Sequence, residues 1–241
     1  MRRWIQYNGI IGYLFLITNI VSARDIERLW ALQYVGSPLV KPVLTSNPSN
    51  CSTGRGSSAI SVMGEYYLPK KWSVEAGYYR TEVSYGDADR TMEGLQLGAR
   101  KYLINPDFFI QPYLTTAMQV NWSSPIKEKA ERWYEQTNLF GTEHYDIAWN
   151  TKNPRVSLAP GVGTEIYLLS PIAFVARYSF NIGLGSRTCV DVTSTSGKSY
   201  QMKDKGMYHQ LELGVKITFP FRFTDEDGES LLNVLRDWLL Y

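Results

Sequence analysis

The chain has 241 residues, a formal net charge of +2 and a slightly negative mean hydropathy. Its near-neutral charge gives no reason to expect a polyanionic partner such as nucleic acid, and its hydropathy disfavours a bundle of membrane-spanning helices. The length suits one barrel or two small domains. The abundance of Tyr, Trp and Phe suits either a soluble all-β domain or a membrane barrel with aromatic girdles at both interfaces.

The first residues have the three parts of a secretory signal. Arg2 and Arg3 precede an apolar run over residues 10–21, and small residues follow up to Ala23. We expect cleavage after Ala23, which predicts a signal peptide over residues 1–23 and export of the remainder. The alternative is an uncleaved anchor, for which the apolar run is short.

Alternating apolar and polar residues recur after the signal and predict eight strands. The clearest stretch is residues 210–219, where every odd position is apolar and every even position is polar, charged or glycine. Successive side chains of a strand point to opposite faces, so each predicted strand has one apolar and one polar face. A weaker strand is predicted over residues 25–35, and the other six cover residues 59–68, 72–83, 91–103, 108–122, 155–168 and 172–184.

The connections between the predicted strands alternate between tight turns and longer loops. The tight turns contain proline and polar residues that favour turns. Outer-membrane barrels have short periplasmic turns and longer extracellular loops, so this alternation indicates a barrel with both termini in the periplasm. The turns are at residues 69–71, 105–107 and 170–171, and the loops at residues 36–58, 85–90, 123–154 and 186–205.

Charged residues on the polar faces lie at similar distances from the tight turns. An eight-stranded barrel has room inside only for side chains, so these residues should form one layer in the periplasmic half of the lumen. Glu65 and Glu75 should face each other, which requires a cation such as Arg100 to offset the repulsion. An ion-paired plug is the favoured interpretation, and a gated polar path is the alternative. The predicted layer comprises Glu65, Glu75, Arg100, Glu165, Arg177, Glu212 and Lys216.

The two cysteines fall in the first and last predicted extracellular loops. The first and last strands of a closed barrel are neighbours, so these loops should be adjacent. A disulfide between Cys51 and Cys189 is therefore predicted, and two free thiols are the alternative.

The longest predicted loop, residues 123–154, is rich in aromatic residues. Ser124 and Pro125 precede an apolar stripe, which predicts a short capped helix beginning near Ile126. The aromatic side chains, among them Trp133, Tyr134 and Trp149, form a candidate surface for a protein or glycan partner.

The closing strand carries a run over residues 213–219, followed by Phe221 and Phe223, that is similar to a signal for barrel insertion. With this run and its strand pattern, the chain resembles the small eight-stranded outer-membrane barrels of the OmpA and OmpX type, including outer-membrane β-barrel proteins of Gram-negative bacteria such as the Bacteroidota. The resemblance covers roughly residues 25–223. It implies an all-β, antiparallel, up-and-down transmembrane barrel over residues 24–223, in contact with outer-membrane lipid, lipopolysaccharide and the barrel-assembly machinery.

Residues 224–241 continue past the point where such barrels end, and they predict a short amphipathic helix. Its apolar face would include Leu231, Leu235 and Trp238. This helix would lie on the inner-leaflet interface, dock under the barrel or bind a periplasmic partner.

The sequence has no catalytic motif, no metal-ligand spacing and no phosphate-binding loop, so neither an enzymatic activity nor a cofactor is expected. By parity His209 faces lipid near the outer leaflet, which resembles barrels that modify lipid A, but the nearest serine by strand geometry is Ser186. The sequence therefore predicts a structural or interaction role, with the extracellular loops and the tail as partner surfaces. A narrow channel for small solutes or ions is the alternative, and a lipid-modifying enzyme is the third interpretation.

Overall fold

The structure, a computed structural model, describes residues 28–46, 57–85, 89–104, 108–123, 126–128, 132–138, 141–194, 197, 199–220 and 228–229. The predicted signal peptide, Cys51 and the apolar residues of the tail (Leu231, Leu235 and Trp238) lie outside the described residues. Within the described ranges, no helix has the length and apolar composition needed to cross a bilayer.

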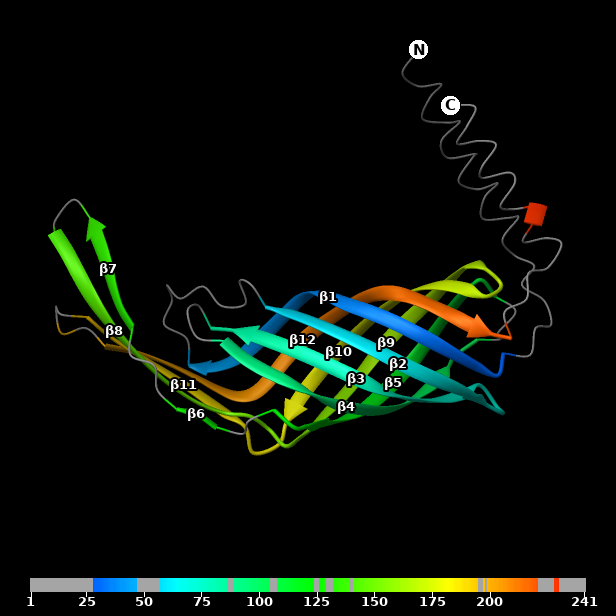
Figure 1. The fold of residues 1–241 in the computed structure, drawn as a ribbon, viewed down its shortest axis with the longest axis horizontal. Helices are drawn as coiled ribbons and strands as arrows, with labels where there is room; N and C mark the ends of the chain where they lie inside the picture. The colour runs from blue at the N-terminus through cyan, green and yellow to red at the C-terminus, as the bar shows by residue number, and fades with distance from the viewer. Residues whose placement is uncertain are drawn as a thin grey trace, which may run out of the picture.

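Eight strands close into an antiparallel barrel (Figure 1). The seam closes where β12 pairs with β1, from Trp30 opposite Phe219 onward. The predicted eight-stranded fold is confirmed, and the weak first strand is present as β1. The barrel strands are β1 (Trp30–Ser46), β2 (Ser58–Leu68), β3 (Trp72–Ser84), β4 (Asp89–Tyr102), β5 (Ile110–Asn121), β9 (Val156–Leu169), β10 (Ile172–Gly183) and β12 (Ser199–Phe219).

The barrel is apolar outside and polar inside. In β2 the apolar Ile60 and Val62 are 38% and 41% exposed, whereas the polar Ser61 and Glu65 are 2% and 3% exposed. The same alternation continues around the wall, because strand period and barrel closure together send every second side chain into the lumen. A water-soluble domain has the opposite arrangement, so this wall is of the transmembrane type.

Aromatic side chains mark both ends of the apolar outer surface, which we call the apolar band. At the end with the tight turns, Trp30 stacks on Phe219 across the seam with ring centroids 4.0 Å apart, and Trp72 is exposed nearby. Toward the other end, Tyr78 and Trp122 lie with their ring centroids 6.1 Å apart. These two levels correspond to the interfacial girdles of a membrane barrel.

A second part of the sheet projects beyond the barrel rim, at the end opposite the tight turns (Figure 1). Here the first part of β12 pairs with β11, β11 pairs with β8, and β8 pairs with β6 and β7. We call this part the projecting sheet. Its strands are β6 (Ile126–Glu128), β7 (Arg132–Asn138), β8 (Gly141–Lys152), β11 (Arg187–Ser194) and the start of β12.

The projecting sheet corrects the predicted loops. Residues 123–154 and 186–205 are largely strands, and the helix predicted to begin near Ile126 is wrong. β7 folds back on β8 through a tight hairpin in which Asn138 pairs with Gly141. The backbone N–H and C=O groups of these residues bond between neighbouring strands, so they do not need the internal hydrogen bonds of a helix. β1 likewise continues to Ser46, where a loop was predicted.

Candidate functional site

The seven predicted lumen charges lie inside the barrel in one continuous group, which we call the lumen cluster. Each of them is at most 4% exposed. Strand register brings them together: Glu65 lies directly opposite Glu75 on β2 and β3, and Arg177 lies opposite Glu212 on β10 and β12. The lumen cluster therefore occupies the part of the lumen nearer the tight turns.

Arg100 is the centre of the lumen cluster. Its Nη1 donates to Glu65 Oε2 at 3.2 Å and to Glu165 Oε1 at 3.0 Å. Its Nη2 pairs with Glu75 and donates to Gln33 Oε1 at 2.8 Å. The cation expected to offset the facing carboxylates of Glu65 and Glu75 thus contacts both of them.

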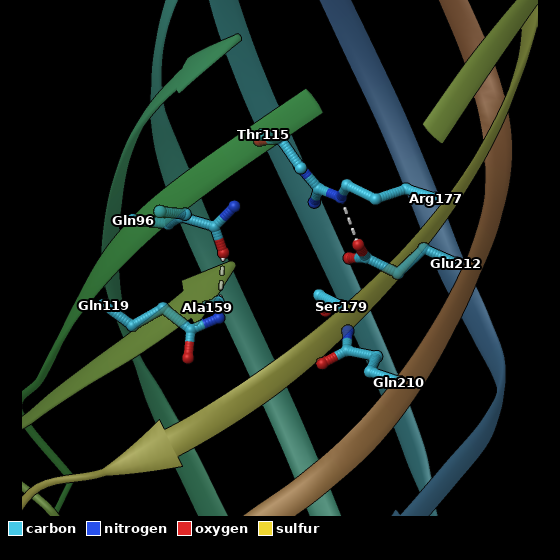
Figure 2. A pocket seen from close by; sticks show the side chains of 9 residues that line it. Gln96, Thr115, Gln119, Ala159, Arg177, Ser179, Gln210 and Glu212 are labelled. Atoms are coloured by element: carbon cyan, nitrogen blue, oxygen red, sulfur yellow. Dashed lines mark hydrogen bonds and ion pairs between the residues drawn. The ribbon is translucent and has the colours of Figure 1, made fainter. Parts of the chain in front are cut away.

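Two further cations hold the remaining carboxylates. Arg177 Nη1 lies 2.9 Å from Glu75 Oε1, and Arg177 Nε pairs with Glu212 (Figure 2). Lys216 Nζ lies 2.6 Å from Glu165 Oε1, and it also pairs with the carboxylate of Glu65. Every carboxylate of the lumen cluster therefore contacts at least one cation.

Arg28, which precedes β1, adds a fourth cation at the tight-turn end of the lumen. Its guanidinium carbon lies 3.8 Å from the centroid of the Tyr167 ring, and its Nη1 donates to Gln111 Oε1 at 3.2 Å. Tyr167 in turn donates to Glu165 Oε2 at 2.8 Å. With Arg28, this described part of the lumen holds four carboxylates and four cations. The alternation pattern did not reveal the fourth cation, because in the predicted strand Arg28 has the same parity as Trp30, which faces outward.

Above the lumen cluster, a layer of neutral amides and hydroxyls encloses a small cavity (Figure 2). Its volume is about 10 Å³, the room that one water molecule needs. Gln119 Nε2 donates to Gln96 Oε1 at 2.9 Å on one side of the cavity, and the Arg177–Glu212 pair lies on the other (Figure 2). Thr115 Oγ1, which lines the cavity, is buried and has no partner among the described residues.

A second buried ion pair closes the lumen near the projecting sheet. Arg90 Nη1 lies 3.2 Å from Asp204 Oδ2, and it also donates to Ser186 Oγ at 3.1 Å and to Thr188 Oγ1 at 3.3 Å. Both members of this pair had been placed in loops. Arg90 nevertheless continues the even-numbered, inward-facing parity of β4, a sequence signal from which its place in the lumen could have been predicted.

Buried apolar and aromatic side chains surround this upper ion pair and fill the end of the lumen opposite the tight turns. They form one packed group, so this end is closed by apolar contacts as well as by charge. The group comprises Val40, Ala59, Tyr79, Val83, Tyr85, Met92, Val190, Met202 and Tyr208.

The aromatic surface predicted on the longest loop is only partly described. Trp149 is half-buried and packs against this apolar group, so it supports the barrel end more than it offers a surface to a partner. Trp133 and Tyr134 lie on β7, and their side chains are outside the described part of the structure.

The structure shows no disulfide between Cys51 and Cys189: Cys189 is a free thiol, and Cys51 lies outside the described residues, so the predicted pair stays a prediction. β11 holds Cys189 in the sheet, opposite Lys203 on β12 and Asn150 on β8, and not in a loop. Partial burial and the neighbouring carboxylate of Asp191 raise the pKa of the Cys189 thiol.

His209 lies on the outer face of the barrel, as parity predicts. Its Nδ1 lies 2.6 Å from the Tyr178 hydroxyl, and its ring centroid lies 5.0 Å from that of Phe180. Ser186, the serine nearest by strand geometry, is turned into the lumen, where it contacts Arg90. The structure does not bring this serine and His209 together.

Comparison with models of protein families found no match, and comparison with curated proteins found none. Among solved structures, the chain is similar to the outer membrane protein OprG from Pseudomonas aeruginosa, with a TM-score of 0.39 and 11% identity over 82% of this chain and 99% of that chain. It is also similar to the outer membrane protein W of E. coli, with a TM-score of 0.42 and 10% identity over 80% of this chain and 98% of that chain.

Proposed function

We propose that this chain is an integral outer-membrane β-barrel with a closed lumen and a structural or interaction role. The observation that carries the proposal is the inverted wall, with apolar side chains outside and ion-paired side chains filling the inside. Such a wall is stable only where the surrounding solvent is lipid. The tight turns and both termini would then face the periplasm, and the projecting sheet would face the exterior.

The closed lumen favours this role over transport. Passage of a solute would require the lumen cluster and the Arg90–Asp204 pair to separate. Removing one partner from a buried ion pair costs about 3–5 kcal/mol, so opening both layers together is unfavourable. The surfaces left for protein partners are the projecting sheet and the predicted tail helix. The other expected partners are outer-membrane lipid and lipopolysaccharide around the barrel, and the barrel-assembly machinery during insertion.

Membrane fractionation combined with planar-bilayer recording tests the proposal. We expect the folded protein to stay in carbonate-washed outer membranes, to show heat-modifiable mobility on a gel and to give no steady conductance. Release of the protein by carbonate would refute the membrane assignment. Stable single-channel steps would refute the closed lumen.

A narrow channel for small solutes or ions is the second candidate function. The water-sized cavity and the polar side chains that line it favour this alternative, since they form a polar segment between the two charged layers. Conductance that changes when the charge is reversed at Glu75 or Arg100 would select the channel. The proposal includes no enzymatic reaction, so a His209→Ala variant is expected to leave the lipid A profile of the cells unchanged.

A further inference from the structure

A row of three basic side chains crosses the outward face of the projecting sheet where it leaves the barrel. Arg187 on β11 pairs in register with Lys152 on β8. Lys205 on β12 follows Asp204, the register partner of Thr188, so Lys205 and Arg187 are neighbours across β11 and β12. All three side chains are exposed, and we call them the basic row.

No acidic side chain in the described part of the chain forms an ion pair with the basic row. Asp204 points into the lumen, where it pairs with Arg90. Asp191 lies further from the barrel and accepts a hydrogen bond from Gln201 Nε2 at 2.6 Å. Because like charges in neighbouring cross-strand positions destabilise a sheet, the basic row favours an anion from outside the chain.

The basic row lies next to the apolar band. On the outward face of β12, Met207 and His209 separate Lys205 from Leu211, and Leu184 at the end of β10 is 52% exposed. A lipid whose chains cover the apolar band would therefore place its headgroup at the level of the basic row.

We propose that the basic row binds the phosphate groups of an anionic lipid of the outer leaflet, whose acyl chains lie on the apolar band below. This inference rests on the proposed function, because it needs the barrel to lie in the membrane with the projecting sheet outside. Neighbouring cross-strand positions have Cβ atoms about 4.5–5.5 Å apart, so two adjacent cations can contact one phosphate. Three cations in a row suit a glycolipid with two phosphates, and the guanidinium of Arg187 supplies a bidentate contact.

The opposite wall offers a matched control. Arg80 on β3 is also exposed above the apolar band, but it lies directly opposite Glu93 on β4. A cation that faces a carboxylate attracts a phosphate less strongly than a row of cations that has no ion pair in the described part of the chain. An Arg80→Gln variant therefore removes the same charge from the outer surface without touching the basic row.

Lipid titration of the purified full-length barrel in non-ionic detergent tests the proposal. The ligands are diphosphorylated lipid A, fully dephosphorylated lipid A and inorganic phosphate, and bound lipid is counted by native mass spectrometry. Each charge removed near a phosphate surface weakens binding about fivefold, so the Arg187→Gln/Lys205→Gln double variant should bind diphosphorylated lipid A about 25-fold more weakly. Arg80→Gln should bind it as the wild type does.

Three results would overturn the inference: unchanged affinity in the double variant, equal binding of the dephosphorylated lipid, or equally effective competition by inorganic phosphate at the same concentration. Heat-modifiable mobility verifies folding first, and if the double variant does not fold, Lys152→Gln alone is expected to weaken binding about fivefold. A wild-type protein that carbonate releases from membranes would refute the proposed function. Retention in the membrane with unchanged lipid binding by the variants would refute only the basic row as a lipid site.

Discussion

Substitution of Arg100 by methionine gives the sharpest test of the lumen cluster. Arg100 contacts Glu65, Glu75 and Glu165, and each of these carboxylates is almost fully buried. Methionine keeps much of the side-chain length but removes the charge and all five donors. Glu65 and Glu165 would then share Lys216 as their remaining cation in the described lumen.

The expected loss of stability follows from this change in charge balance. Removing one partner of a buried ion pair costs about 3–5 kcal/mol, and Arg100→Met leaves buried carboxylates in excess, so we expect a loss of at least about 4 kcal/mol. Glu75→Gln should cost only about 1–2 kcal/mol. In that variant Arg100 keeps Glu65 and Glu165, and Arg177 keeps Glu212, so no cation loses its last partner.

Urea unfolding in phospholipid vesicles, followed by tryptophan fluorescence, measures these free energies, and Arg80→Gln on the outer face is the control. The double variant Arg100→Met/Glu75→Gln should be more stable than the sum of its single effects predicts, because the two residues share one network. An Arg100→Met barrel that unfolds at the wild-type urea concentration would refute the ion-paired plug. So would a Glu75→Gln variant that is less stable than Arg100→Met.

Two further predictions concern packing and thiol chemistry. A Cβ at Gly163 would lie 2.4 Å from Tyr113 Cζ, so Gly163→Ala should lower the free energy of unfolding by about 1–3 kcal/mol. At Gly64 the nearest atom would be 3.7 Å away, so Gly64→Ala should be close to neutral in the same urea assay. Burial and Asp191 raise the pKa of Cys189, so Asp191→Asn should speed maleimide labelling of Cys189 at pH 8 in a single-cysteine background. The two labelling rates should become equal at a pH above the thiol pKa of both proteins. Equal labelling rates already at pH 8 would show that Asp191 does not raise the thiol pKa.

The eight barrel strands and their inward faces were predictable from the sequence, because the period of two is a local property of the chain. The spacing from the Pro69 turn was enough to place Glu65 opposite Glu75, since a tight hairpin sets the register of both its strands. The lumen cluster was predictable for the same reason, and parity alone placed His209 outside.

Other features depend on pairing between distant segments, and only the tertiary structure shows them. β8 and β11 build the projecting sheet by joining Trp149 to Val190, two residues separated by a complete barrel hairpin. The same pairing turns Ser186 inward toward Arg90, holds Cys189 in a strand and creates the basic row. Local alternation thus determined which face of each strand meets lipid, whereas strand pairing beyond the rim decided which charges meet each other, because a register between distant segments leaves no periodic trace in either one.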